Sequence, residues 1–150
     1  MADRKHRSPS GYDDFIRRNP DLAYGGYKPW ESPDMDLVRS VNEAVNAANR
    51  YRPDAPGKDT WGGGGYDCED YAVTKKRKLL EAGVPPGALR FALGERNGRQ
   101  HIMLVVNGVV LDNLTNRMYP LTNRGAATHI ESKKGWRDVT KPMTWDDLLP

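Results

Sequence analysis

Two Asn-Gly dipeptides constrain the fold of this 150-residue chain more than any other feature, because each of them separates two apolar runs. They are Asn97-Gly98 and Asn107-Gly108. Asn-Gly in this setting is the strongest short signal for a two-residue hairpin turn of type I′. The two turns therefore predict an antiparallel meander of three strands, at about 88–95, 100–106 and 109–115.

The second turn also fixes the register of the strands that it joins. Met103 then faces Asp112, and His101 becomes the diagonal neighbour of Asp112, with backbones roughly 7–8 Å apart. The first hairpin places Gly94 opposite His101, which leaves room for a His–Asp pair on this face. The other face is wholly apolar and is expected to form core: Leu89, Phe91, Leu93, Ile102, Leu104, Val106, Val109 and Leu111.

Two helices precede the meander. The spacing of apolar residues predicts the first over Asp36–Arg50, with Asp34 or Asp36 as its cap. The second begins at Asp67 or Cys68 and ends before the "VPP" tripeptide. Its basic run, Lys75–Lys78, is interpreted as a solvated face. Helices packed on an antiparallel meander give an α+β fold.

The remaining segments carry weaker signals. Residues 1–33 are polar and rich in Gly and Pro, and we expect an arm with little regular structure, either a disordered tail or a segment that docks on a partner. Residues 34–150 are expected to form the domain. Within it, "ATHIESKKGWRDV" is expected to form one or two short strands, and "TWDDLLP" a short terminal helix.

Composition and charge limit the classes of partner and the location that we expect for this chain. A net charge of +3 argues neither for nor against nucleic acid, but the basic run lacks an aromatic stacking platform, so we expect no nucleic-acid partner. No apolar run is long enough for a membrane span. The N-terminus lacks the apolar stretch of a secretory signal, so we expect the chain to remain in the cytoplasm or to travel inside a phage virion.

The only cysteine, Cys68, lies in "KDTWGGGGYDCEDYA" at the expected start of the second helix. A helix N-terminus favours a thiolate, a histidine can exchange its proton, and an acid can orient the imidazole. Cys68, His101 and Asp112 are therefore candidate catalytic residues. Trp61 is a candidate donor to an oxyanion, with loop packing as the alternative. A buried structural cysteine is the simpler alternative for Cys68.

"YDCEDYAVTKKRKLLEAGVPPGALRFAL" and "HIMLVVNGVVLDNLT" resemble the bacterial transglutaminase-like cysteine proteinases, a family that includes the LapG-like proteases. The resemblance covers about residues 36–136 and implies a papain/transglutaminase-like fold. It also implies Cys68 as nucleophile, His101 as general base and acid, and Asp112 as the orienting acid. Protein or peptide amides would be the substrates.

The same resemblance implies that calcium binds beside the nucleophile, through the positions of Asp67, Glu69 and Asp70. Carboxylates are the ligands that Ca²⁺ prefers, although acids also stabilise a helix N-terminus without any metal. Hydrolysis, transamidation and peptidoglycan cleavage remain open as reactions. The alternative function is a catalytically silent structural or binding component of a phage particle, with residues 1–33 as the arm that binds a neighbour.

Overall fold

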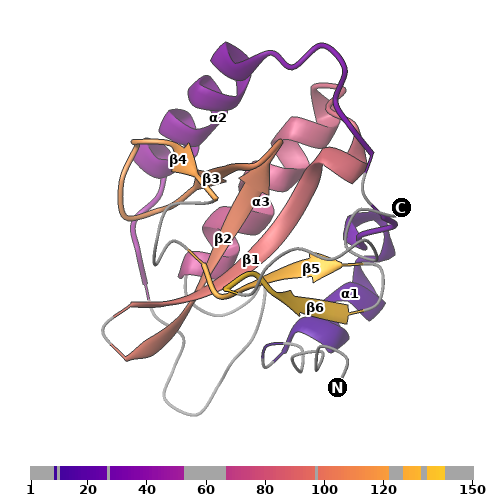
Figure 1. Ribbon diagram of the computed structural model, residues 1–150. Coiled ribbons are helices and arrows are strands. Elements are labelled where there is room, and N and C mark those ends of the chain that lie inside the picture. Colours follow the sequence, from indigo (N-terminus) through magenta and orange to yellow (C-terminus); the bar gives the residue numbers. More distant parts are fainter. Residues whose placement is uncertain are drawn as a thin grey trace.

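In the computed structural model, the described residues are 9, 11–26, 28–52, 67–96, 98–121, 127–132 and 135–140. They form helices packed on one sheet with the strand order β4-β3-β2-β1-β5-β6 (Figure 1). Every neighbouring pair of strands is antiparallel, which confirms the α+β prediction. The elements are α1 (Tyr12–Arg18), η1 (Pro20–Leu22), α2 (Met35–Ala48), α3 (Cys68–Glu81), η2 (Pro86–Ala88), β1 (Leu89–Arg96), β2 (Arg99–Val106), β3 (Val109–Leu111), β4 (Tyr119–Pro120), β5 (His129–Ser132) and β6 (Gly135–Asp138).

The meander of β1, β2 and β3 forms in the predicted register. Gly94 pairs with His101 across the first hairpin, and Val106 pairs with Val109 across the second. At the second turn Asn107 has φ 50° and Gly108 has φ 80°. Both values are left-handed, as a type I′ turn requires of its two central residues.

Strand β3 is shorter than predicted, since it ends at Leu111 rather than near residue 115. Asp112, the next residue, has other partners. Its carboxylate Oδ1 accepts a hydrogen bond from Leu114 N at 3.1 Å, and its carbonyl oxygen accepts one from Lys75 Nζ at 3.2 Å. The side chain and carbonyl of Asp112 thus turn the chain out of the ladder.

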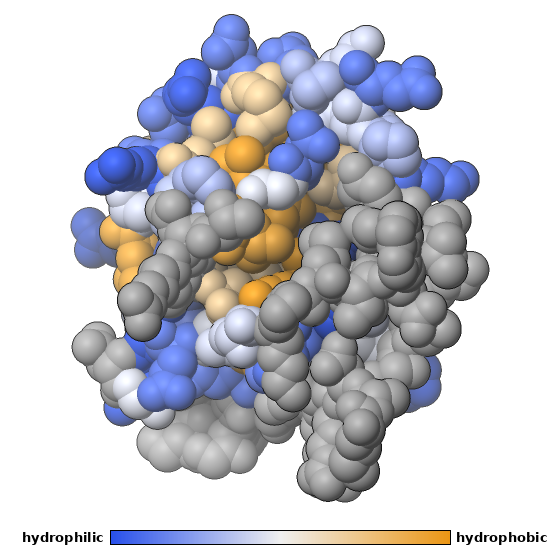
Figure 2. Space-filling model, viewed as in Figure 1, coloured by the Kyte–Doolittle hydropathy of each residue, from blue (hydrophilic) through white to orange (hydrophobic). Residues whose placement is uncertain are grey.

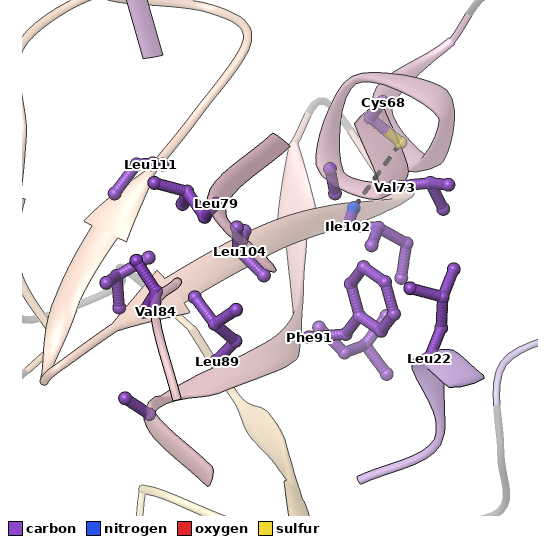
Figure 3. Close-up of a cluster of buried hydrophobic side chains, with 14 of the residues drawn as sticks. Leu22, Cys68, Val73, Leu79, Val84, Leu89, Phe91, Ile102, Leu104 and Leu111 are labelled. Atoms are coloured by element: carbon purple, nitrogen blue, oxygen red, sulfur yellow. Dashed lines mark hydrogen bonds between the residues drawn. The ribbon is translucent and has the colours of Figure 1, made fainter. Parts of the chain in front are cut away.

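One face of the sheet packs on α3, which lies across the β1–β2 hairpin (Figure 1). Phe91, Leu104 and Leu79 of α3 are completely buried between them (Figure 3). This is the face that the alternation predicted as core. The opposite face is also buried, in a second cluster formed by Ala92, Met103, Val105, Val110, Ala127 and Ile130.

Helix α2 begins where Asp34 Oδ1 accepts a hydrogen bond from Leu37 N at 3.0 Å, as one of the two expected caps. It ends at Ala48, two residues before the predicted end. Buried Asn42 donates to Asn116 O at 3.2 Å, and so ties α2 to the segment between β3 and β4.

The expectation of little regular structure before residue 34 is wrong for the described part of that segment. It contains α1 and η1, and Phe15 and Leu22 are buried in the cluster under α3. The Tyr12 ring meets the Trp136 ring edge-on, with centroids 5.1 Å apart. Apolar residues at these few positions are enough to fix the arm on the core. Its docking on a partner remains a prediction.

The interpretation of Lys75 and Lys76 as solvated residues is also wrong, because each is only 1% exposed. Lys76 Nζ donates to Leu22 O at 2.9 Å and lies 4.8 Å from the centre of the Phe91 ring. The N-terminal arm covers this side of α3. The basic run alone gives no sign that this side is covered. Burial lowers the pKa of Lys76, and the nearby charge of Glu131 opposes that change.

Toward the C-terminus, β5 and β6 confirm the two short strands, and Trp136 of β6 is buried. The terminal helix was expected in residues 144–150, which lie outside the described residues. In the described ranges, none of the helices combines the length and apolar character that a bilayer span needs.

Gly87 of η2 permits a close approach of the N-terminal segment. A Cβ at this position would lie 2.6 Å from both Cβ and N of Lys28, and 2.9 Å from Gly26 O. Gly87→Ala should therefore lower the free energy of unfolding by about 1–3 kcal/mol, because backbone atoms cannot step aside as a side chain can. Gly25→Ala is the matched control, since nothing lies within 4 Å of its Cβ position. Urea unfolding of the two variants measures the difference, and equal midpoints would contradict the packing described.

Candidate functional site

His101 and Asp112 form the predicted pair. His101 Nε2 lies 2.7 Å from Asp112 Oδ1, and both residues are buried. The contact crosses from β2 to the residue that follows β3, along the diagonal that the hairpin register predicts. An ionised carboxylate at this distance favours the tautomer with hydrogen on Nε2, which leaves Nδ1 as the basic ring nitrogen.

Several groups hold Asp112 in place. Its Oδ2 accepts a hydrogen bond from Tyr119 OH at 3.0 Å and lies 3.7 Å from Arg96 Nη2. Burial would raise the pKa of Asp112, but His101, the Leu114 N–H and Tyr119 outweigh burial and lower it to about 2. The carboxylate is therefore ionised at neutral pH.

Cys68 is the first residue of α3, and its sulfur lies at the edge of β2. Cys68 Sγ accepts a hydrogen bond from Ile102 N at 3.4 Å (Figure 3). In an antiparallel ladder, residues two apart direct their N–H groups to the same neighbour. Leu104 pairs with Leu111 of β3, but β3 has ended before it could reach Ile102. The sulfur occupies the place that a carbonyl of β3 would otherwise take, beside the residue that follows His101.

The Cys68 thiol has a second hydrogen-bond partner, whose effect on the thiol pKa is opposite to that of the Ile102 N–H. Cys68 Sγ donates to Glu69 Oε2 at 3.3 Å. Burial and the charge of Glu69 raise the pKa of the Cys68 thiol, while the Ile102 N–H works in the other direction. With the protein groups alone, these effects exceed the lowering expected from the helix N-terminus.

Three acids surround this thiol, and all three are buried: Asp67, Glu69 and Asp70. Asp70 Oδ2 accepts a hydrogen bond from Asp67 N at 3.0 Å, which is half of a capping box. Burial and its acidic neighbours raise the pKa of Asp67 to about 10, and burial raises that of Glu69. The acids cap the helix, but they also repel one another.

The chemistry of this acidic cluster, Asp67, Glu69 and Asp70, fits a hard cation in part. Asp67 Oδ1 is buried with no hydrogen-bond partner in the described structure, and a cation would satisfy it and offset the repulsion. The side chains do not converge into a complete cage, since no group of three His, Cys, Asp or Glu able to hold a metal ion occurs within the described ranges. Further oxygen ligands would have to come from elsewhere.

The structure thus brings Cys68, His101 and Asp112 to one end of β2. Trp61, the candidate oxyanion donor, lies outside the described residues. Sequence reasoning missed Tyr119 and Arg96. Tyr119 is on the two-residue strand β4, where it pairs with Val110, and no turn motif or apolar alternation indicates so short a strand. Arg96 could have been found, because it directly follows the predicted strand 88–95 and precedes the Asn97-Gly98 turn.

A surface pocket of about 540 Å³ lies between α2 and the β3–β4 strands. Arg39 and Met118 line it, together with Tyr119. Hydrophobic residues gather in the middle of the face shown in Figure 2, with polar residues along the upper border. Because Tyr119 lines this pocket while its hydroxyl binds Asp112, it links the pocket to the His101–Asp112 pair.

Comparisons with known proteins identify the family and the fold of the chain. Residues 3–143 match the model of a family described as bacterial transglutaminase-like cysteine proteinase. No curated protein sequence is significantly similar to the chain.

Among solved structures, calcium-bound LapG of Legionella pneumophila superimposes with a TM-score of 0.61 at 20% identity, over 92% of this chain and 84% of LapG. EGTA-treated LapG gives 0.59 at 19% identity, over 92% and 82% of the two chains. A third LapG structure gives 0.59 at 20% identity, over 95% and 88%. This likeness confirms the transglutaminase-like fold, and the family match spans most of the sequence. The chain belongs to the bacterial transglutaminase-like cysteine proteinases.

Proposed function

We propose that this protein is a cysteine peptidase that cleaves peptide or side-chain amides through an acyl-enzyme on Cys68. The observation that carries the proposal is the position of the sulfur. It is held on the amide of Ile102, next to a histidine whose Nε2 is bound to Asp112. The nucleophile of α3 is thus held beside the base on β2, and the orienting acid that follows β3 binds that base.

In the first half of the reaction, the Cys68 proton passes to Nδ1 of His101, and the thiolate attacks the amide carbonyl carbon. The backbone N–H of Cys68, at the first turn of α3, can donate to the oxygen that becomes negative. Trp61 is a further candidate donor. His101 then gives its proton to the departing amine, which leaves the acyl group on sulfur.

In the second half, His101 takes a proton from water, and the resulting hydroxide attacks the thioester carbon. The sulfur leaves and regains its proton from His101, and the carboxylic acid is released. Asp112 steadies the imidazolium at both stages and remains ionised. An amine in place of water would give transamidation by the same steps.

A second candidate function is a catalytically silent relative that serves as a binding or structural component, for example of a phage particle. One observation favours it: Cys68 is only 9% exposed, and its pKa is raised rather than lowered. Reactivity of the thiol separates the two candidates.

With Ca²⁺ present, iodoacetamide should label Cys68 faster in the native protein than in the urea-unfolded chain, because His101 assists the thiolate. His101→Gln should slow labelling of the native protein to the unfolded rate. Mass spectrometry of the single cysteine gives both rates. Equal, slow labelling of native and unfolded wild-type protein would exclude an activated thiol.

Peptidase activity itself can be tested without a known substrate. New protein N-termini in a bacterial lysate should appear on incubation with the wild-type protein, and Cys68→Ala should abolish them. His101→Gln should reduce their rate of appearance by about 10²-fold or more, the usual contribution of general acid–base catalysis. His129→Gln is the control, since His129 is on β5, outside the site. Identical N-termini from wild-type and Cys68→Ala protein would refute the proposal.

We further propose that Ca²⁺ binds at Asp67, Glu69 and Asp70. The buried, unpartnered Asp67 Oδ1 and the repulsion among these carboxylates support it, and a relative, LapG, has been solved with calcium. The bound ion would supply positive charge beside the nucleophile. That charge would offset the effect of Glu69 and Asp67 on the thiol.

Calcium at 100 times its dissociation constant should stabilise the fold by about 2.7 kcal/mol, whereas the same concentration of Mg²⁺ should do less. Asp67→Asn should lose the calcium effect. In EGTA this variant should be as stable as wild-type or more so, because a raised pKa means that burying the ionised Asp67 costs stability at neutral pH. Thermal unfolding of wild-type protein in Ca²⁺, Mg²⁺ and EGTA, and of the variant in Ca²⁺ and EGTA, gives these differences. Identical melting of wild-type protein in Ca²⁺ and EGTA would exclude the site.

A further inference from the structure

We propose that Tyr119 and Arg96 are positioning residues that hold Asp112 by its Oδ2, and so present its Oδ1 to His101. The catalytic meaning of this inference rests on the proposed function. The arrangement itself rests on the described contacts of Asp112 alone.

The two carboxylate oxygens of Asp112 have separate partners. Oδ1 lies 2.7 Å from His101 Nε2, and Oδ2 accepts the Tyr119 hydroxyl at 3.0 Å. Arg96 Nη2 lies 3.4 Å from that hydroxyl and 3.7 Å from Oδ2. The carboxylate is therefore held at both oxygens, and its plane is fixed relative to the imidazole.

Asp112 needs such support because it lies just beyond the ladder. Strand β3 ends at Leu111, so pairing with β2 does not fix the Asp112 backbone. Asn46 Nδ2 and Lys75 Nζ bind its carbonyl at 3.0 Å and 3.2 Å. Leu114 N binds Oδ1 at 3.1 Å, so Tyr119 and Arg96 are the groups that hold Oδ2. Without Tyr119 and Arg96, Oδ2 would be a buried acceptor without a protein partner, which commonly costs about 1–3 kcal/mol. A rotated carboxylate could relieve that cost at the expense of the bond to His101.

Tyr119 is anchored independently of the catalytic residues. It pairs with Val110 across β3, and Pro120 pairs with Val109. Its hydroxyl comes from the strand on the far side of β3 and therefore approaches Asp112 from the direction opposite to β2. Arg96 arrives from the end of β1. Three strands thus converge on one carboxylate.

Tyr119→Phe removes only the hydroxyl and tests the inference. In protein with ¹⁵N-labelled histidine, the proton between His101 Nε2 and Asp112 should give a downfield resonance, assigned by its loss in His101→Gln. In Tyr119→Phe this resonance should move upfield or disappear through exchange with water. Arg96→Met should shift it in the same direction by a smaller amount. Iodoacetamide labelling of Cys68 should slow several-fold in Tyr119→Phe.

Tyr12→Phe is the matched control, because the Tyr12 hydroxyl also donates to a buried carboxylate, that of Glu131, on another part of the molecule. It should lower stability and leave the His101 resonance in place. A resonance that is unchanged in Tyr119→Phe, or equally changed in Tyr12→Phe, overturns the inference. So does its absence from the wild-type protein.

The positioning role of Tyr119 and the proposed peptidase activity can fail independently of each other. If the resonance responds to Tyr119→Phe and no new N-termini appear in a lysate, positioning stands and peptidase activity fails. If the protein cleaves and the resonance does not respond, the peptidase stands and the positioning role of Tyr119 fails.

Discussion

The early end of strand β3 is the constraint on which the candidate site depends. Because β3 stops at Leu111, the Ile102 N–H of β2 is free to bind the Cys68 sulfur, and Asp112 is free to turn its carboxylate toward His101. Two more residue pairs in that ladder would use the Ile102 N–H and close the place of the sulfur. The nucleophile, base and acid therefore meet where a sheet edge is left unfinished.

The sequence predicted the parts of this arrangement that follow from local rules. Asn107-Gly108 determines a turn, the turn determines a register, and the register brings His101 diagonal to Asp112. It could not predict Tyr119, because a two-residue strand has no period to read. The burial of Lys75 and Lys76 could not be predicted for a related reason. Lys76 binds Leu22, which is 54 residues away and becomes a neighbour only when the arm folds back. Lys75 binds the carbonyl of Asp112, 37 residues away.

The acids beside Cys68 have two roles with opposite consequences for the thiol. As caps they stabilise the start of α3, and as buried charges they oppose formation of a thiolate next to them. The proposed Ca²⁺ would reconcile the two, since it would preserve the carboxylates and cancel their field. The protein groups alone favour a protonated Cys68, so reactivity and metal binding are expected to rise together.

The docking of α1 has a consequence for how the chain folds. The Tyr12 hydroxyl binds Glu131, 119 residues later, and the Tyr12 ring meets Trp136. Contacts between positions so far apart slow folding, because a long loop must close before they form. During synthesis the N-terminal helix must wait until β5 and β6 have left the ribosome. Until then Phe15 and Leu22 lack much of their cover, and the nascent chain exposes apolar surface that chaperones recognise.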